Sequence, residues 1–125
     1  MDLKIGDIFT WGRTFNEEEV MQFAELSGDK GIHHMERDEK GRLMVHGLFT
    51  ASISTKIGGD LNFIAREMVN DFVRPVFTGD TITCEVEVTN VEQGERYKKI
   101  KLKSTYRNQV GKVVINGTID GIIRN

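Results

Sequence analysis

Asp29 and His34 are the two side chains best suited to move a proton, and they stand five positions apart in the sequence. A helical pattern ends just before Asp29 and no second one begins before His34, so we expect both side chains on a loop where they can reach one small volume. A carboxylate and an imidazole held together can orient a water molecule and exchange a proton with it. The spacing therefore predicts acid–base chemistry on a bound small molecule.

A donor for developing negative charge follows at His46 and Gly47. These residues open the most apolar helical pattern of the chain, and the first N–H groups of a helix have no partner within it. We expect the Gly47 N–H to point outward with the helix dipole behind it, where it can donate to a carbonyl oxygen that gains negative charge. Together with Asp29 and His34, this donor predicts chemistry beside a carbonyl group.

The composition narrows the class of protein. The chain has 125 residues and a net charge of −2, so we expect one domain over residues 1–125 and neither nucleic acid nor a membrane as a partner. The single cysteine, Cys84, excludes an internal disulfide. With no signal-peptide pattern and no long apolar run, this favours a cytoplasmic protein.

Two helices are expected to position the candidate groups. Asn16, followed by three glutamates, is typical of a helix start, and Gly28 is expected to end that helix, which leaves Asp29 as the first residue beyond it. The apolar face of this helix is formed by Val20, Phe23, Ala24 and Leu26. The second helix is expected over residues 47–57, with Gly58 and the following glycine ending it. Because it carries so little charge, we expect it to be covered nearly all round.

The rest of the chain follows the two-residue period of strands. A short strand is expected over residues 8–11, and long antiparallel strands are expected to form a meander over residues 63–73, 80–91, 99–107 and 112–123. Such a sheet has one apolar face, which must be buried against something. The central helix is the only element able to cover it.

Four motifs in this order resemble those of the MaoC-like (R)-specific enoyl-CoA hydratases. In this chain they are Ser27-Gly28-Asp29 with His34, Val45-His46-Gly47-Leu48, Phe72-Val73-Arg74-Pro75-Val76 with Gly79-Asp80-Thr81, and Gly111-Lys112-Val113-Val114. Gly31 and Ile32 stand where that family has Asn and Pro, and the interval from His34 to His46 is shorter than usual. The resemblance implies an α+β hot-dog fold, in which an antiparallel sheet wraps around a central buried helix.

The resemblance also implies a reaction. Water held between Asp29 and His34 would add reversibly to a trans-2-enoyl thioester of coenzyme A (CoA) or an acyl carrier, giving a (3R)-3-hydroxyacyl thioester, while the Gly47 N–H holds the thioester oxygen. We expect three residues to contact the substrate: His46, Leu48 and Lys56. No cofactor is expected beyond the CoA that is part of the substrate.

Some of these residues have a second interpretation. Adjacent side chains of an extended chain point to opposite sides, so only one of His33 and His34 can face Asp29, and the motif spacing selects His34. His46 is also suited to packing at the start of the helix, without acid–base chemistry. Asp29, His34 and His46 are ligand types that zinc accepts, but their spacing follows no metal signature, so we expect no metal.

The basic residues and the cysteine are open to a structural interpretation too. Lys56 could reach a CoA phosphate or extend into solvent at the helix end. Cys84 falls in the apolar register of its strand, so we expect a buried side chain and not a nucleophile. A row of basic residues could meet CoA phosphates or form a solvated strand face that discourages edge pairing. Its members are Lys99, Lys101, Lys103 and Arg107.

Two other functions remain open. A hot-dog thioesterase would use Asp29 to direct water to the carbonyl carbon, although the central helix carries no carboxylate between Gly47 and Gly59. A non-catalytic acyl-thioester binder or assembly subunit would explain Gly31 and Ile32. In each case we expect a homodimer at least, because pairing two sheets about a twofold axis covers an exposed sheet edge.

Overall fold

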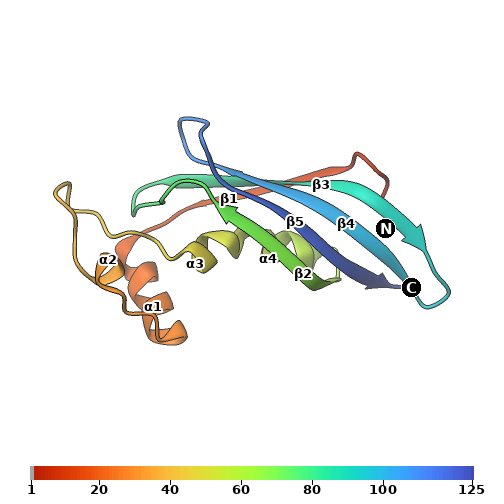
Figure 1. The fold of residues 1–125 in the computed structure, drawn as a ribbon, viewed down its shortest axis with the longest axis horizontal. Coiled ribbons are helices and arrows are strands. Elements are labelled where there is room, and N and C mark those ends of the chain that lie inside the picture. The colour runs from red at the N-terminus through yellow and green to blue at the C-terminus, as the bar shows by residue number, and fades with distance from the viewer. Residues whose placement is uncertain (1) are drawn as a thin grey trace.

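A five-stranded antiparallel sheet with helices along one face and at one end forms the molecule (Figure 1). The computed structural model describes residues 2–125. The elements in chain order are β1 (Ile8–Thr14), α1 (Glu17–Ser27), α2 (Ile32–Met35), α3 (Gly47–Ala51), α4 (Ile53–Asp60), β2 (Phe63–Phe72), β3 (Thr81–Gln93), β4 (Tyr97–Arg107) and β5 (Val113–Arg124). This arrangement confirms the expected α+β class. Among residues 2–125, no helix is both long and apolar enough to cross a membrane.

The strand order is β1-β3-β4-β5-β2, and every neighbouring pair is antiparallel. Strands β3, β4 and β5 form the expected meander, but β2 pairs with β5, so the prediction of one continuous meander was wrong at β2. The reason is that β1 already occupies the other side of β3, through pairs that run from Ile8 with Glu87 to Thr14 with Thr81. Strands β1 and β2 are therefore the two edges.

The core forms between the sheet and α4. Alternate residues of β3 and β4 are buried, as the two-residue period predicted, and they are Ile82, Cys84, Val86, Val88, Ile100, Leu102, Ser104 and Tyr106. Ile53 and Ile57 of α4 belong to the same hydrophobic cluster. The opposite strand face carries the row of basic residues, all exposed, with Lys103 paired in register to Glu87 and Lys99 to Glu92. This placement favours the interpretation as a solvated face.

Helix α1 begins and ends as expected. The Asn16 side chain accepts from the Glu19 N–H at 2.8 Å, while the Asn16 N–H donates to the Glu19 carboxylate at 3.1 Å. Gly28 ends the helix in the left-handed region, at φ +80°. Leu26 does not belong to the apolar face, because it is 88% exposed. The buried stripe of α1 is narrow and contains only Val20 and Ala24.

The central helix is broken in two at Ser52. The Thr55 N–H donates to the Ser52 carbonyl at 2.9 Å, which leaves the Ala51 carbonyl to accept the buried Tyr106 hydroxyl at 2.7 Å. The prediction that Gly58 and Gly59 end the helix was wrong, since α4 continues to Asp60. Glycine costs a helix interior only about 1 kcal/mol. The left-handed residue beyond α4 is Asn62, at φ +56°.

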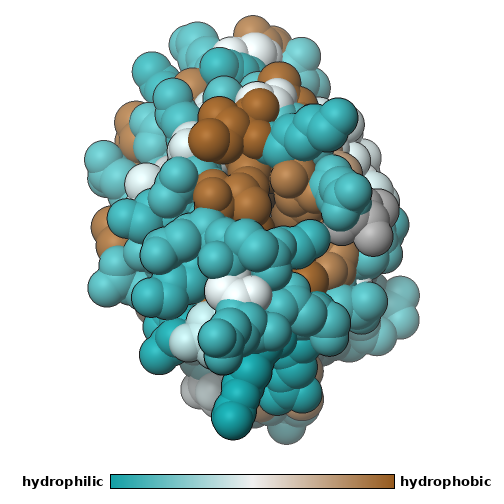
Figure 2. Space-filling view, turned by 90° about the vertical axis from the view of Figure 1, so that its right-hand side faces the viewer, coloured by the Kyte–Doolittle hydropathy of each residue, from teal (hydrophilic) through white to brown (hydrophobic). Residues whose placement is uncertain are grey.

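The central helix is covered on one side only. Leu48 is 70% exposed, and Thr55 and Lys56 are also exposed. The prediction of cover nearly all round was therefore wrong for a single chain, because one five-stranded sheet reaches only one side of the helix. At the end of the molecule where the C-terminus lies, hydrophobic side chains also gather within a mostly hydrophilic surface (Figure 2).

Candidate active site

The loop after α1 holds Asp29 in a fixed turn. The Asp29 Oδ1 accepts the Gly31 N–H at 3.1 Å, and the Asp29 N–H donates to the Ser27 hydroxyl at 3.1 Å. The hydrogen bond from Gly31 is the main cause that lowers the pKa of Asp29, and the nearby His34 lowers it further, against the opposing effect of partial burial. Asp29 is therefore an ionised, half-exposed carboxylate at neutral pH.

His34 lies on the one-turn helix α2 and not on an extended loop, which corrects the first expectation. The turn is closed by the hydrogen bond from the Glu36 N–H to the Ile32 carbonyl at 2.9 Å. His34 is only 5% exposed, and its Nδ1 lies 2.7 Å from the Met44 carbonyl oxygen. Because a carbonyl only accepts, Nδ1 carries the proton, and Nε2 of the neutral ring is left as an acceptor.

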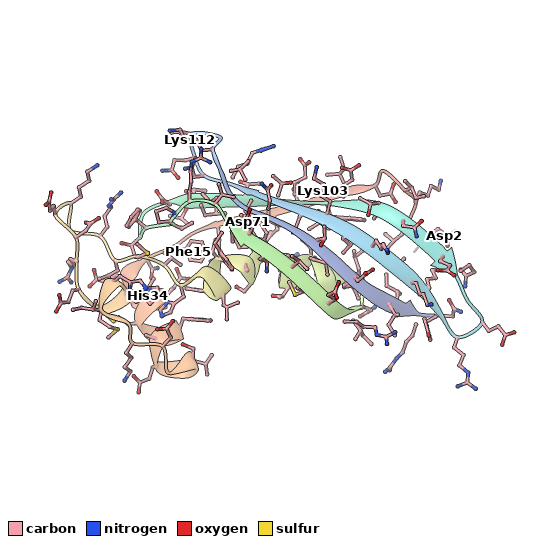
Figure 3. The ribbon with its side chains drawn as sticks, viewed as in Figure 1. Asp2, Phe15, His34, Asp71, Lys103 and Lys112 are labelled. Atoms are coloured by element: carbon pink, nitrogen blue, oxygen red, sulfur yellow. The ribbon has the colours of Figure 1, made fainter. Side chains whose placement is uncertain are left out.

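The structure brings Asp29 and His34 together, as their spacing predicted. The His34 Nε2 lies 3.6 Å from the Asp29 Oδ2. This separation is longer than a direct hydrogen bond, and a water molecule beside the pair, off the line that joins the two atoms, can lie within reach of both groups. Figure 3 shows His34 at the end of the molecule formed by α1 and α2. His33 is exposed, with its ring centroid 3.9 Å from that of His34.

His46 lies behind His34 and is 2% exposed. Its Nε2 lies 2.9 Å from the backbone carbonyl oxygen of Asp29, and its ring stacks on the His34 ring at 3.7 Å and 17°. This position leaves little of His46 for the substrate contact expected from the sequence. It agrees better with the packing interpretation.

Asp29, His34 and His46 are also the groups that could hold a metal ion, since one ligand atom of each lies within 4.8 Å of the others. The lone pair of an imidazole nitrogen lies in the ring plane. Two rings stacked nearly parallel direct their lone pairs side by side and not to a common point, so this geometry does not suit a chelated ion. We therefore keep the expectation of no metal.

A hollow of about 300 Å³ lies beside His34. Its lining includes His33, His34, Gly47, Thr50, Phe72 and Arg74. Gly47 begins α3, and a Cβ there would lie 2.8 Å from the Phe72 ring, so glycine lets the ring close over the start of the helix. The hollow is thus lined both by the start of α3, which is predicted to donate a hydrogen bond, and by the His34 imidazole, which is predicted to move a proton.

Leu48 and Lys56 are placed differently. Leu48 follows Gly47 but is turned outward and is absent from the lining of the hollow. Lys56 lies on α4, where its Nζ contacts the Asp60 carboxylate at 2.5 Å and lies 5.8 Å from the Trp11 ring centroid. The structure does not bring Lys56 to the Asp29–His34 pair.

Two contributors to the site were missed from the sequence. The Met44 carbonyl fixes the protonation pattern of His34, but a backbone acceptor leaves no side-chain signal in a sequence. Phe72 closes over Gly47, and its membership in the Phe72-Val73-Arg74-Pro75-Val76 motif is the signal that could have pointed to a role in the site.

The fold and the site define a hot-dog domain with a carboxylate–imidazole pair beside the start of its central helix. The family model described as "MaoC like domain" matches residues 8–110. The chain is 32% identical to an (R)-specific enoyl-CoA hydratase of Rhodospirillum rubrum, over 93% of this chain and 85% of that protein. It is 25% identical to a mitochondrial 3-hydroxyacyl-[acyl-carrier-protein] dehydratase of Solanum lycopersicum, over 92% of this chain and 74% of that protein.

Solved structures agree with these relatives. The (R)-hydratase from A. caviae involved in PHA biosynthesis is 29% identical and superimposes with a TM-score of 0.83, covering 95% of this chain and 96% of that chain. This chain therefore belongs to the MaoC-like domain family. The named relatives are hydro-lyases, the enzyme class expected from the sequence.

Proposed function

We propose that this chain catalyses the reversible hydration of trans-2-enoyl thioesters of CoA or an acyl-carrier protein to (3R)-3-hydroxyacyl thioesters. The observation that carries the proposal is the pair of Asp29 and His34, whose Oδ2 and Nε2 lie 3.6 Å apart beside a hollow that Gly47 also lines. The relatives named as an (R)-specific enoyl-CoA hydratase and a 3-hydroxyacyl dehydratase support the same reaction.

In the proposed mechanism, a water molecule lies between the Asp29 carboxylate and the His34 Nε2. Nε2 accepts a proton from the water because Nδ1–H is engaged with the Met44 carbonyl. The water oxygen bonds to Cβ of the enoyl group, and a proton passes from the pair to Cα. Run backward, the same steps remove water from the hydroxyacyl thioester, with neither a metal nor a further cofactor.

Negative charge gathers on the thioester oxygen during the addition, and the Gly47 N–H is the proposed donor to it. This N–H belongs to the first turn of α3, where helix N–H groups lack a partner within the helix. Loss of one such preorganised donor typically raises a barrier by about 3–4 kcal/mol.

One assay tests the proposal against its alternatives. The purified chain is mixed with a short-chain trans-2-enoyl-CoA, and both the enone absorbance and the release of free thiol are followed. A hydratase bleaches the absorbance without releasing thiol. Thiol release would identify a thioesterase, and binding of the thioester with neither change would identify a non-catalytic binder; either result rejects the proposed reaction.

We also propose that the chain works as a homodimer. Strand β2 is a sheet edge with large apolar side chains that are at least 40% exposed, namely Ile64, Met68, Val69 and Phe72. A second copy would cover this edge and the open side of the central helix near Leu48. Light scattering coupled to size exclusion at micromolar concentration should give twice the chain mass, and a monomer would contradict the proposal.

A further inference from the structure

We infer that His46 is a positioning residue, which ties the Asp29 loop and the His34 ring to the start of α3. The inference rests on the proposed function, in which Asp29, His34 and Gly47 act together. His46 contacts the backbone of Asp29 and the ring of His34, and it directly precedes Gly47 in the chain. One buried side chain therefore links all three parts of the site.

The hydrogen bond from His46 fixes its own protonation. The Asp29 carbonyl can only accept, so the His46 Nε2 carries a proton and donates it across 2.9 Å. Its Nδ1 is buried and, among residues 2–125, finds no hydrogen-bond partner. The bond from Nε2 to the Asp29 carbonyl is therefore the only hydrogen bond of this ring among residues 2–125.

The Asp29 loop needs a tether because its own contacts are local. Its side chain accepts the Gly31 N–H, and its N–H donates to the hydroxyl of Ser27, the last residue of α1, so both partners lie within two residues of Asp29. Gly28 and Gly31 flank Asp29, and glycine restricts a loop least. The bond from His46 instead reaches the loop from an element 17 residues further along the chain.

His46 itself is firmly held. Its carbonyl accepts the Thr50 N–H at 3.0 Å in the first turn of α3, and the preceding Val45 N–H donates to the Val76 carbonyl at 2.7 Å. The His46 ring contacts the rings of His34 and Phe23, at centroid distances of 3.7 and 4.8 Å. Because His46 is held in place, its hydrogen bond can also hold the Asp29 loop in place.

The stacked face of His46 also sets the plane of the His34 ring. The nearly parallel contact, at 17°, helps to keep the His34 Nδ1–H on the Met44 carbonyl and its Nε2 toward Asp29. His46 thus acts through His34 and Asp29, without touching the substrate.

Two substitutions distinguish the tether, which is the hydrogen bond from His46 to the Asp29 carbonyl, from the packing of the His46 ring. His46→Phe keeps a ring in the stack and removes the donor to Asp29, whereas His46→Gln places an amide N–H near the former Nε2 and removes the ring. We expect His46→Phe to lower kcat for enoyl-CoA hydration at least 30-fold with KM within threefold of wild type, and His46→Gln to recover kcat to within about tenfold. Val20→Ala, a buried truncation on α1, is the control for lost stability and should leave kcat unchanged.

The inference is overturned if folded His46→Phe keeps kcat within threefold of wild type, or if folded His46→Gln is as slow as His46→Phe. A second readout does not depend on activity, namely hydrogen exchange at the Gly31 amide, which bonds to the Asp29 side chain. We expect at least tenfold faster exchange in His46→Phe than in wild type, His46→Gln or Val20→Ala. If wild type hydrates no enoyl thioester, the proposed function fails, while equal exchange in all four proteins would overturn the tether.

Discussion

Replacing Asp29 by Asn removes one charge from the site while keeping its shape. An Asn side chain retains the oxygen that accepts the Gly31 N–H at 3.1 Å, so the turn after Gly28 is preserved. The change removes the second carboxylate oxygen, which lies 3.6 Å from the His34 Nε2 and faces the proposed water. The substitution therefore tests the charge and basicity of Asp29 with little change in packing.

The expected loss is large for activity and small for stability. Positioned proton transfer contributes about 10²- to 10⁴-fold to a rate, and the Asn amide can neither accept a proton nor hold the water by charge. We expect kcat/KM to fall at least 100-fold. The Asp29 side chain is 56% exposed, so at neutral pH the unfolding midpoint should fall only slightly below that of wild type.

The assay is bleaching of the enone absorbance of a short trans-2-enoyl-CoA, with unfolding followed by circular dichroism. Asp38→Asn is the matched control, because the Asp38 Oδ1 also accepts a backbone N–H two residues further on, from Lys40 at 2.9 Å, and Asp38 lies in an exposed loop. The control should keep full activity. If Asp29→Asn retains more than a tenth of wild-type kcat/KM, the assigned role of Asp29 is refuted.

Four further outcomes are expected. The fold lowers the pKa of Asp29 below its usual value of 3.8, so the ionised carboxylate stabilises the fold above that pH. The difference in unfolding midpoint between wild type and Asp29→Asn should therefore shrink as pH falls below 3.8. Tyr106→Phe loses a buried hydrogen bond of 2.7 Å, worth about 1 kcal/mol of unfolding free energy, and should lower the melting temperature by about 4 °C in calorimetry. Burial raises the pKa of Cys84 to about 12, so thiol reagents at pH 8 should label it only when urea unfolds the chain; rapid labelling of the native protein would contradict its burial. Gly47→Ala pushes the Phe72 ring, 2.8 Å from the new Cβ, and should lower kcat/KM about tenfold in steady-state assays while the melting temperature changes little.

The local elements could be predicted from the sequence because their signals are local. The cap at Asn16 and the stop at Gly28 depend on residues within one turn, and the structure has both. Buried and exposed side chains alternate along β3 and β4 because the sheet has one buried face. The sequence of each strand therefore indicates which of its side chains face the core. The Asp29–His34 pair could be predicted as well, because the motif fixes their spacing.

Distant contacts could not be read in the same way. The Tyr106 hydroxyl, which donates to the Ala51 carbonyl beside the break at Ser52, reaches it from a strand 55 residues further along. The place of β2 beside β5 depends on β1 having taken the edge of β3. The short helix α2 is a single turn without a side-chain cap, held by backbone hydrogen bonds and by the contact of His34 with Met44.

The position of β2 at the sheet edge bears on the order in which the protein can assemble. Phe63 of β2 pairs with Ile123, and Phe72 pairs with Ile115. A growing polypeptide on the ribosome therefore makes β2 long before its partner strand exists, and such pairings between distant segments slow folding. Since Phe72 also closes over Gly47, and Ile115 of β5 lines the same hollow beside His34, this hollow is completed only after β5 has emerged.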